Sequence, residues 1–393
     1  MFIKRSMKKK LEDAASGLPV IGILGPRQSG KTTLAREVFK HHRYFSLELP
    51  SVLDAITADP QGFLEENKNP HGIILDEFQN MPQLLSYIQV YVDENPQPGY
   101  FVLTGSQNFL MNQAITQSLA GRISLFTLLP LSIQELKEAN LLPEKSSTCL
   151  FTGFYPRLFA AHKENPNFLY NNYLQTYLER DVRLLQNVVN LLDFKRFMGL
   201  CAGRIGQLLN ITELANDCGI DQKTAKAWLS VLEASYIIHL MPPYFRNNFG
   251  KRLVKMPKLY FYDTGLACSL LNITTEEQLL THYLRGGLFE SMIISDLIKH
   301  FYNNRYNPPL YFWRDSHGNE IDCIIEQGSK LIPVEIKSSM TITSNYFKGF
   351  EYWKDLIGAD FQGGYIIYGG SETQRRHENR VIGWQSTDKI FEQ

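Results

Sequence analysis

Apolar runs alternate with helix-like segments in the first half of the chain. Five runs predict strands, at residues 20–25, 43–50, 71–76, 99–108 and 124–132. The first run is continuously apolar and closed by glycine, and the residues that follow it have helical spacing. This order of elements predicts an α/β fold built on a parallel sheet.

The turn between the first run and its helix carries a phosphate-binding sequence. Its glycines and the pair Lys31-Thr32 fit G-x-x-x-x-G-K-[ST], in which backbone N–H groups surround a phosphate at a helix N-terminus. Lys31 would reach the β- and γ-phosphates of ATP, and Thr32 would hold Mg²⁺. The predicted nucleotide-binding residues are Gly25, Pro26, Arg27, Gln28, Ser29, Gly30, Lys31, Thr32 and Thr33.

Residues at the ends of later runs complete a predicted site for ATP hydrolysis. Asp76 follows an apolar run and would contact Mg²⁺ through water, while Glu77 would polarise the attacking water. Ser106, or nearby Thr104, would sense the γ-phosphate at the tip of the fourth run. The sequence therefore predicts an ATPase that uses Mg²⁺.

Arg122 stands in SLAGRIS, just before the fifth run. It could neutralise γ-phosphate charge in its own subunit or in a neighbour's, which would require a homo-oligomer. It could equally be a solvated surface arginine. Arg27, inside the phosphate-binding turn, has the same ambiguity.

The middle of the chain has the spacing of helices. Residues 165–205 predict long packed helices, and 211–238 predict a helix, a turn at 218–220 and a second helix, with Thr212 and Asp221 as N-caps. Two strands around a wing would follow, so this part predicts a winged helix. The predicted core residues of the helix pair are Leu214, Ala215, Ala225, Trp228, Leu229 and Leu232.

The predicted wing concentrates positive charge that could contact the phosphates of DNA. The predicted recognition helix offers only Lys223 and Lys226, and many winged helices merely pack domains together. DNA binding and a structural role are therefore equally open. The basic residues of the wing are Arg246, Lys251, Arg252, Lys255 and Lys258.

Acidic residues interrupt apolar strand patterns near the end of the chain. YFWRD, NEIDCIIE and KLIPVEIK predict three strands joined by the turns DSHGN and QGS. Folding the last two strands back about QGS places Glu326 opposite Leu331 and Asp322 opposite Glu335. Opposed like charges among apolar neighbours are unfavourable, and a divalent cation such as Mg²⁺ would remove the conflict.

Lys337 lies two residues beyond Glu335 and hence on the same strand face. There it could stabilise a water nucleophile or the charge on an attacked phosphate. Asp322 and Glu335 as metal ligands, with Lys337 beside them, predict a phosphodiester-cleaving site.

Two family resemblances accompany these motifs. GPRQSGKTTL, IILDEFQNMP, LTGSQNFL, SLAGR, YLERDV and KMPKLYFYDTGL resemble the landmarks of prokaryotic AAA-type ATPases that carry a C-terminal domain of unknown function. The acidic residue followed by E-x-K on adjacent strands resembles the PD-(D/E)XK, or restriction-endonuclease-like, nuclease superfamily. That second resemblance implies a preceding acidic residue on a helix, a place taken by Glu290, and the catalytic set Glu290, Asp322, Glu335 and Lys337.

The composition of the chain argues against several functional classes and points to no specific one. Lys plus Arg and Asp plus Glu number 40 each, so the net charge of zero predicts no general attraction to nucleic acid or to a membrane surface. The 5 cysteines are odd in number and form no C-x-x-C pair, which argues against disulfides and zinc and favours a reducing cytoplasm. No apolar segment has the length of a membrane span.

The expected architecture has three domains. They are an AAA-type P-loop ATPase domain with a helical lid at 1–190, a winged-helix-like domain at 191–272 and a PD-(D/E)XK nuclease-like domain at 273–393. We expect the nucleotide state to gate a DNA-associated, nuclease-like domain. The alternative is a nucleotide-dependent interaction switch whose last domain does not cleave.

Overall fold

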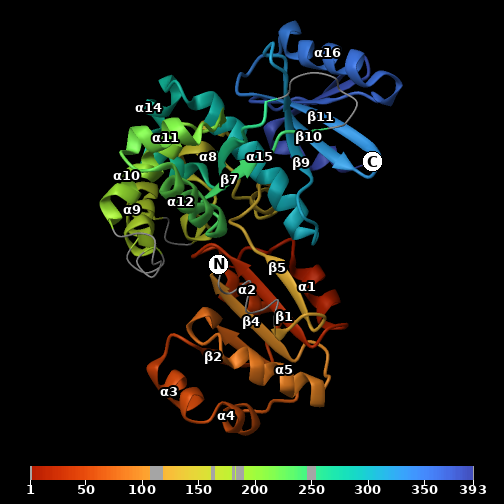
Figure 1. The fold of residues 1–393 in the computed structure, drawn as a ribbon. Helices are drawn as coiled ribbons and strands as arrows, with labels where there is room; N and C mark the ends of the chain where they lie inside the picture. The colour runs from red at the N-terminus through yellow and green to blue at the C-terminus, as the bar shows by residue number, and fades with distance from the viewer. Residues whose placement is uncertain are drawn as a thin grey trace.

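The described part of the chain contains three β-sheets with helices around and between them. In Figure 1 the N-terminal sheet lies at the bottom, the helical middle part at the upper left and the C-terminal sheet at the upper right. No helix of this part is long and apolar enough to cross a membrane. The computed structural model describes residues 2–106, 118–160, 164–178, 182, 190–245 and 254–392.

The N-terminal sheet is parallel and has the strand order β2-β3-β4-β1-β5. All five apolar runs form strands, which confirms the predicted parallel α/β arrangement. The strands are β1 Val20–Gly25, β2 Arg43–Ser46, β3 Ile73–Asp76, β4 Phe101–Ser106 and β5 Ile123–Thr127.

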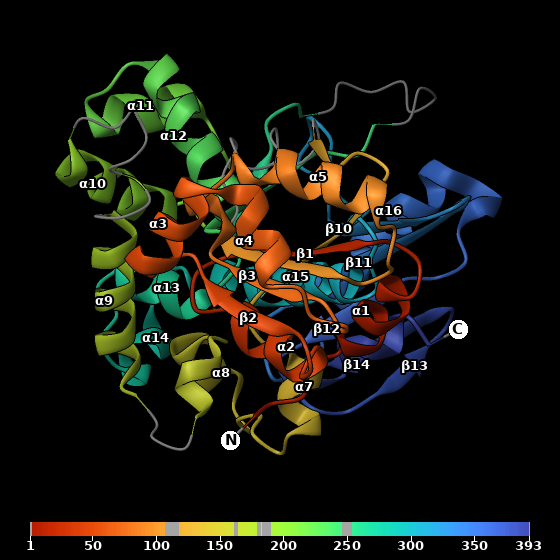
Figure 2. The same cartoon turned by 90° about the horizontal axis from the view of Figure 1, so that it is seen from below.

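Helices cover both faces of this sheet because the side chains of its strands alternate between them. Ile21 and Ile23 of β1 pack with α1 and α2, whereas Val20 and Leu24 pack with α3, α4 and α5. Figure 2 shows the two sets of helices on opposite sides of the sheet. Their bounds are α1 Lys8–Ala15, α2 Lys31–Val38, α3 Pro50–Ala58, α4 Pro60–Glu66 and α5 Leu84–Glu94.

The middle part combines helices with a small antiparallel sheet of order β6-β8-β7. Its strands are β6 Gln207–Leu208, β7 Ile238–Met241 and β8 Lys258–Phe261. Its helices are α7 Ile133–Glu138, α8 Ser146–Thr152, α9 Pro166–Tyr177, α10 Leu191–Ala202, α11 Ile211–Cys218, α12 Gln222–Ala234, α13 Thr264–Leu270 and α14 Glu276–Thr281.

The predicted helix pair forms as α11 and α12, and its six predicted core residues are buried. Gly219 ends α11 with a left-handed φ of 75°, and Asp221 caps α12 by accepting from the Thr224 backbone. The predicted cap Thr212 is wrong. Asn210 caps α11 instead, because its side chain reaches the backbone N–H of Thr212 at 3.0 Å.

The C-terminal sheet is mixed and has the order β13-β14-β12-β11-β10-β9. β10 and β11 pair with Glu326 opposite Leu331 and Cys323 opposite Val334, which confirms the register predicted from the QGS turn. The elements are β9 Leu310–Arg314, β10 Glu320–Gln327, β11 Lys330–Lys337, α16 Lys348–Ile357, β12 Tyr365–Tyr368, β13 Gln374–Arg376 and β14 Asn379–Gly383.

One helix, α15 Arg285–Asn303, contacts all three parts. It packs against β5 of the first sheet, β8 of the middle sheet and β11 of the last sheet, and Figure 1 shows it at the centre of the molecule. Most of its side chains are buried. It therefore links the N-terminal sheet to the C-terminal one.

Residues next to β7 and β8 cover the edge strand of the C-terminal sheet. The Tyr244 backbone N–H donates to the Phe312 carbonyl at 2.7 Å, and the Phe312 N–H donates to the Pro242 carbonyl at 3.2 Å. The Val254 N–H donates to the Arg314 carbonyl at 3.3 Å. The middle part thus supplies hydrogen bonds that β9 would otherwise lack.

Candidate functional site

The phosphate-binding loop connects β1 to α2 at the carboxyl edge of the N-terminal sheet. A Cβ atom on Gly25 would lie 2.2 Å from the Leu128 carbonyl oxygen, so only glycine fits where β1 ends. Gly30 precedes α2 with a left-handed φ of 94°. The buried Lys31 ammonium donates to the carbonyls of Gly25 at 3.1 Å and Pro26 at 2.8 Å. Its charge therefore lies within the loop.

Asp76 lies beside Thr32 because β3 and β1 flank β4 in the sheet. The Thr32 hydroxyl donates to Asp76 Oδ1 at 2.9 Å, and the Tyr44 hydroxyl donates to Oδ2 at 2.7 Å. Thr104 of β4 donates to the same carboxylate. Burial and the hydrogen bond to Asp76 raise the pKa of Tyr44 to about 12, so Tyr44 stays a donor. A hydroxyl next to an oriented carboxylate fits Mg²⁺, which takes oxygen ligands and retains water.

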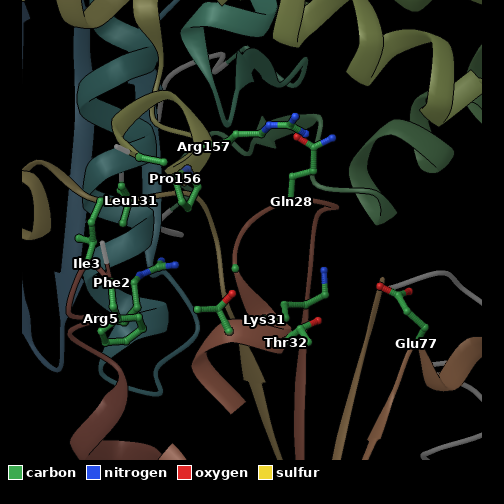
Figure 3. Close-up of a pocket in the computed structure, with 13 residues that line it drawn as sticks. Phe2, Ile3, Arg5, Gln28, Lys31, Thr32, Glu77, Leu131, Pro156 and Arg157 are labelled. Carbon is green, nitrogen blue, oxygen red and sulfur yellow. The ribbon is translucent and has the colours of Figure 1, made fainter. Parts of the chain in front are cut away.

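A cavity of about 450 Å³ opens above the loop. Figure 3 shows Lys31 and Thr32 at its base, Glu77 to one side, and Gln28 of the loop close to Arg157. Its lining combines charged and polar side chains with apolar ones, which suits a phosphate chain joined to an aromatic base. The lining residues are Phe2, Ile3, Arg5, Gln28, Gly30, Lys31, Thr32, Thr33, Glu77, Leu131, Pro156, Arg157 and Ala160.

Two further predicted catalytic residues of this site, Glu77 and Ser106, lie at the same end of the sheet. Glu77 follows β3 with a left-handed φ of 56° and accepts a hydrogen bond from the Gln79 amide. Ser106 ends β4 and is the register partner of Gly25. Thr104 is buried against Asp76, so Ser106 is the better placed of the two predicted γ-phosphate sensors.

Arg5 is a site residue that the sequence patterns did not reveal. Its guanidinium donates to the Ser29 carbonyl of the phosphate loop at 2.8 Å and to the Leu129 carbonyl at 2.6 Å. Its Nε atom pairs with Glu135 at 3.0 Å. These partners are distant in sequence and Arg5 stands in a generally basic segment, so no local signal distinguished it.

Arg157 is the second cationic residue of the cavity that the sequence did not indicate. It lies directly after Pro156 and forms an ion pair with Glu164, with an Nε–Oε2 distance of 2.6 Å. Its side chain is 64% exposed and lies next to Gln28 in Figure 3. Because the arginine is largely exposed, its ion pair is weak and can be exchanged for a phosphate partner.

Arg122 lies at the amino-terminal ends of the strands, opposite the end that carries the phosphate loop. It precedes β5, and its carbonyl accepts from the N–H of Val20 at the start of β1. The phosphate loop follows the other end of β1, about 20 Å away for a six-residue strand. The interpretation that Arg122 serves its own subunit's nucleotide is therefore wrong. Its side chain instead pairs with Asp93 at 2.5 and 2.7 Å.

The predicted wing is only partly within the described chain. Arg246, Lys251 and Arg252 lie outside the described residues, and Lys255 is exposed. Lys258 belongs to the predicted basic stripe, but it is only 3% exposed. Its inclusion in a DNA-facing stripe is wrong, because its side chain points into a cluster of carboxylates.

Glu290, Asp322, Glu335 and Lys337 come together around a second cavity, of about 700 Å³. The Lys337 ammonium lies 2.8 Å from Asp322 Oδ2 and 2.7 Å from Glu335 Oε2. The backbone N–H of Ile336 also donates to Asp322 Oδ2, at 2.8 Å. The strand register brings three of the residues together, and α15 adds Glu290.

Two residues of β8 complete this acidic site. Lys258 Nζ lies 3.0 Å from Glu290 Oε1, contacts Glu320 and lies 4.0 Å from Asp322 Oδ1. The Tyr260 hydroxyl donates to Glu290 Oε1 at 2.5 Å. The signal that could have found Lys258 is a lysine that opens an otherwise apolar strand, KLYF.

Burial and neighbouring charges shift the pKa values of the carboxyl groups in different directions. Although burial opposes ionisation, Lys337 and Lys258 lower the pKa of Asp322 to about 2. Burial and the charge of Asp322 raise the pKa of Glu335 well above its usual range. Burial also raises the pKa of Glu290, against the opposing effect of Lys258. Asp322 is therefore the firmly ionised member of the set.

Glu335 carries an unsatisfied atom in this cavity. Its Oε1 atom is buried and accepts no hydrogen bond, while the residue is only 5% exposed. Such an oxygen next to an ionised aspartate fits a divalent cation. No group of three or more His, Cys, Asp or Glu side chains in the described ranges is arranged to hold a metal. Asp322 and Glu335 are the two carboxylates that could share an ion with water molecules, as Mg²⁺ accepts.

Family models match three consecutive parts of the chain. An AAA domain matches residues 18–137, a domain of unknown function (DUF8612) matches 143–277, and a second one (DUF4143) matches 285–386. The uncharacterized proteins Rv2008c of Mycobacterium tuberculosis and Mb2031c of Mycobacterium bovis are each 30% identical over 340 residues. Those alignments cover 86% of this chain and 74% of each relative.

Solved structures of ATPases are also similar at low sequence identity. A Walker-type ATPase of Pyrococcus abyssi is 18% identical with a TM-score of 0.43, and covers 68% of this chain and 96% of its own. The RuvB Holliday junction branch migration motor of Thermotoga maritima is 18% identical with a TM-score of 0.32. That match covers 60% of this chain and 89% of the motor.

Proposed function

Since this chain belongs to the family of AAA-domain P-loop ATPases in which DUF8612 and DUF4143 domains follow the AAA domain, we propose that ATP turnover controls a nucleic-acid-cleaving site in its last part. The observation that carries the proposal is the buried, unpartnered Glu335 oxygen beside Asp322 and Lys337. The resemblance to restriction-endonuclease-like proteins supports the same assignment.

In the ATP site, each residue has a distinct task. Lys31 would exchange its two loop carbonyls for the β- and γ-phosphates. Thr32 and Asp76 would hold Mg²⁺, which neutralises charge on the phosphate oxygens. Glu77 would orient the attacking water, and Ser106 would contact the γ-phosphate. The adenine ring would lie against the apolar side chains of Phe2 and Ile3.

In the acidic site, Asp322 and Glu335 would hold one divalent ion, which supplies positive charge to the attacked phosphodiester. Lys337 donates to both carboxylates and would place its ammonium beside the phosphate oxygens or the attacking water. Glu290 would complete the set from α15. The substrate proposed is DNA, reached through the wing residues Arg246, Lys251 and Arg252 and through the C-terminal domain.

Contacts of α15 support control of the acidic site by the ATP site. Lys299 donates to the Leu131 carbonyl at 3.0 Å, and Asp296 accepts from the Ile133 N–H at 2.8 Å. Glu290 lies on the same helix. Arg5 connects the neighbouring Leu129 carbonyl to the phosphate loop, so a shift of that loop would be passed to α15.

The test compares variants of the full chain on single-stranded, duplex and branched DNA, with Mg²⁺ or Mn²⁺ and with or without ATP. Asp322→Ala should abolish metal-dependent cleavage and leave ATP hydrolysis in place, because the two sites occupy different parts of the fold. Glu326→Ala, on the same strand but outside the cavity lining, is the matched control and should cleave normally. Cleavage by Asp322→Ala at the wild-type rate would refute the assignment.

A second candidate function is a nucleotide-dependent interaction switch. Lys337 and Lys258 already neutralise carboxylates of the acidic site without any metal, an arrangement that a non-cleaving domain would also tolerate. The absence of cleavage for every DNA and both metals, together with ATP-dependent changes in protease sensitivity of the last part, would favour the switch.

A further inference from the structure

Strand β8 contributes a lysine from the middle part to the acidic site. Lys258 is the first residue of β8 and is only 3% exposed. Its ammonium lies 3.0 Å from Glu290 Oε1 and 4.0 Å from Asp322 Oδ1, and it contacts Glu320. These carboxylates belong to α15 and β10. The acidic site is therefore shared between two parts of the chain.

Two lysines, the buried Lys258 and the partly exposed Lys337, pair with the carboxylates of the site. Lys337 bridges Asp322 and Glu335, with distances of 2.8 and 2.7 Å. Lys258 bridges Glu290 and Glu320 and lies 4.0 Å from Asp322 Oδ1, and Arg314 also pairs with Glu320 at 3.1 Å. An ionised carboxylate is stable away from water only when it is paired, so each half of the cluster has its own compensating cation.

The backbone fixes the position of Lys258. β8 is the central strand of its sheet, where Lys258 pairs with Leu208 of β6 and Met241 of β7. Close packing holds β6 against α15, since a Cβ atom on Gly206 would lie 2.8 Å from the Cα of Gly287. Unlike a surface lysine, Lys258 cannot swing out to solvent without opening this sheet.

We propose that Lys258 is a positioning residue that takes the place of a second divalent ion. It occupies the space between Glu290 and Glu320, where such an ion would find its oxygens. Lys337 is 29% exposed and can turn toward solvent, which leaves Asp322 and Glu335 free to hold one ion. The inference rests on the proposed function only in treating Asp322 and Glu335 as ligands of that one ion. The site would accordingly act on a phosphodiester with one metal rather than two.

The experiment counts Mn²⁺ ions bound to the full chain. Thr32→Ala/Asp76→Asn serves as the parent variant, so that the ATP site contributes neither of its two proposed metal ligands. By calorimetry without nucleotide, the parent should bind one ion. Adding Lys258→Met should allow a second ion or tighten binding at least tenfold, because Glu290 loses its cation and Glu320 keeps only Arg314. Lys255→Met is the matched control on the exposed side of the same segment and should bind as the parent does.

Thermal unfolding provides a second measurement in case Lys258→Met lowers stability. Unpaired buried carboxylates destabilise the fold, and an ion bound only by the folded state restores stability by mass action. Mn²⁺ should therefore raise the melting temperature of Lys258→Met more than that of the parent.

The inference would be overturned if the parent and the Lys258→Met variant had equal Mn²⁺ stoichiometry, affinity and Mn²⁺-induced stabilisation. It would also be overturned if the Lys258→Met chain stayed unfolded in saturating Mn²⁺. A parent that binds no Mn²⁺ while the variant does would support Lys258 as the fixed cation. That result would instead refute the metal site of the proposed function, so the two failures are distinguishable.

Discussion

Arg5 and Glu135 form a buried ion pair although 130 residues separate them. The Nε–Oε1 distance is 3.0 Å, and the two side chains are 5% and 0% exposed. Glu135 also accepts from the Ser6 N–H at 2.8 Å, and Arg5 also donates to the phosphate loop. The first residues of the chain are thereby tied to the nucleotide site.

Arg5→Met should destabilise the protein strongly, because it leaves Glu135 buried without a cation. The expected loss in the free energy of unfolding is about 3–5 kcal/mol, measured by urea denaturation. ATP affinity should fall as well, since the Ser29 carbonyl loses its donor. The double variant Arg5→Met/Glu135→Gln should regain part of the loss. A single variant as stable as wild type would contradict this account.

Lys31→Ala should abolish tight ATP binding, whereas Glu77→Gln should bind ATP and lose turnover. Lys31 supplies charge at the phosphates, but Glu77 acts only on the water. Binding is measured with a fluorescent ATP analogue and turnover by phosphate release. Gln79→Ala, which removes only the amide that donates to Glu77, is the control and should reduce turnover modestly. Normal hydrolysis by Glu77→Gln would remove Glu77 from its role.

Arg122→Ala tests whether a neighbouring subunit completes the ATP site. If it does, turnover should fall by about a thousandfold with binding retained. Mixing Arg122→Ala with Lys31→Ala chains should restore part of the activity, because each chain supplies what the other lacks. Asp93→Ala breaks the same surface pair and should leave turnover unchanged. Wild-type turnover by Arg122→Ala would make it an ordinary surface residue.

Lys251→Ala/Arg252→Ala should weaken DNA binding if the wing contacts phosphates. Each lost contact should reduce the slope of log affinity against log salt by about one. Fluorescence anisotropy at several salt concentrations measures that slope. Lys223→Ala/Lys226→Ala provides the comparison on α12. A slope that does not change for the first pair would assign the wing a structural role.

The stability of the protein should fall as the pH drops from 6.5 to 4, in part because of His239. Burial lowers the pKa of this β7 histidine to about 4, so the unfolded chain binds more protons in that window. The neutral His239 side chain contributes at most about 3 kcal/mol to the free energy of unfolding. This contribution is complete above pH 6.5 and is lost as the pH falls through 4.

The variant His239→Phe keeps the ring contact to Tyr262, whose centroid lies 5.9 Å away. It should flatten the pH dependence of the urea midpoint between pH 6.5 and 4, while leaving the dependence between pH 7 and 8 as in wild type. Burial also lowers the pKa of His300 to about 4, and this residue would supply the slope that persists. An unaltered slope would show that His239 does not contribute.

Local patterns in the sequence predicted the five strands of the N-terminal sheet and the pairing of β10 with β11. Each run of the N-terminal sheet is bounded by its own turn residues, and β1 matches the predicted 20–25 run at both ends. The QGS turn fixed the pairing of β10 with β11, because a tight hairpin leaves little freedom of register. Asp322, Glu335 and Lys337 could be grouped for that reason.

Residues that act through distant partners could not be predicted in this way. Lys258 and Lys255 both belong to the predicted basic stripe, and only the apolar run that Lys258 opens distinguishes them, yet Lys258 is buried among carboxylates and Lys255 is exposed. What separates them is the packing of α15 against β8. Arg5 and Arg122 are further cases, since the tertiary fold alone decides which arginine lies near the phosphate loop.

Truncation experiments must take the covered edge of β9 into account. A fragment that begins at residue 285, where the DUF4143 match starts, would lose the backbone partners that Tyr244 and Val254 give to Phe312 and Arg314. Its outermost strand would then offer bare N–H and C=O groups for pairing with another copy. Insolubility or inactivity of such a fragment would reflect the missing middle strands, and a fragment intended to isolate the acidic site should begin before β6.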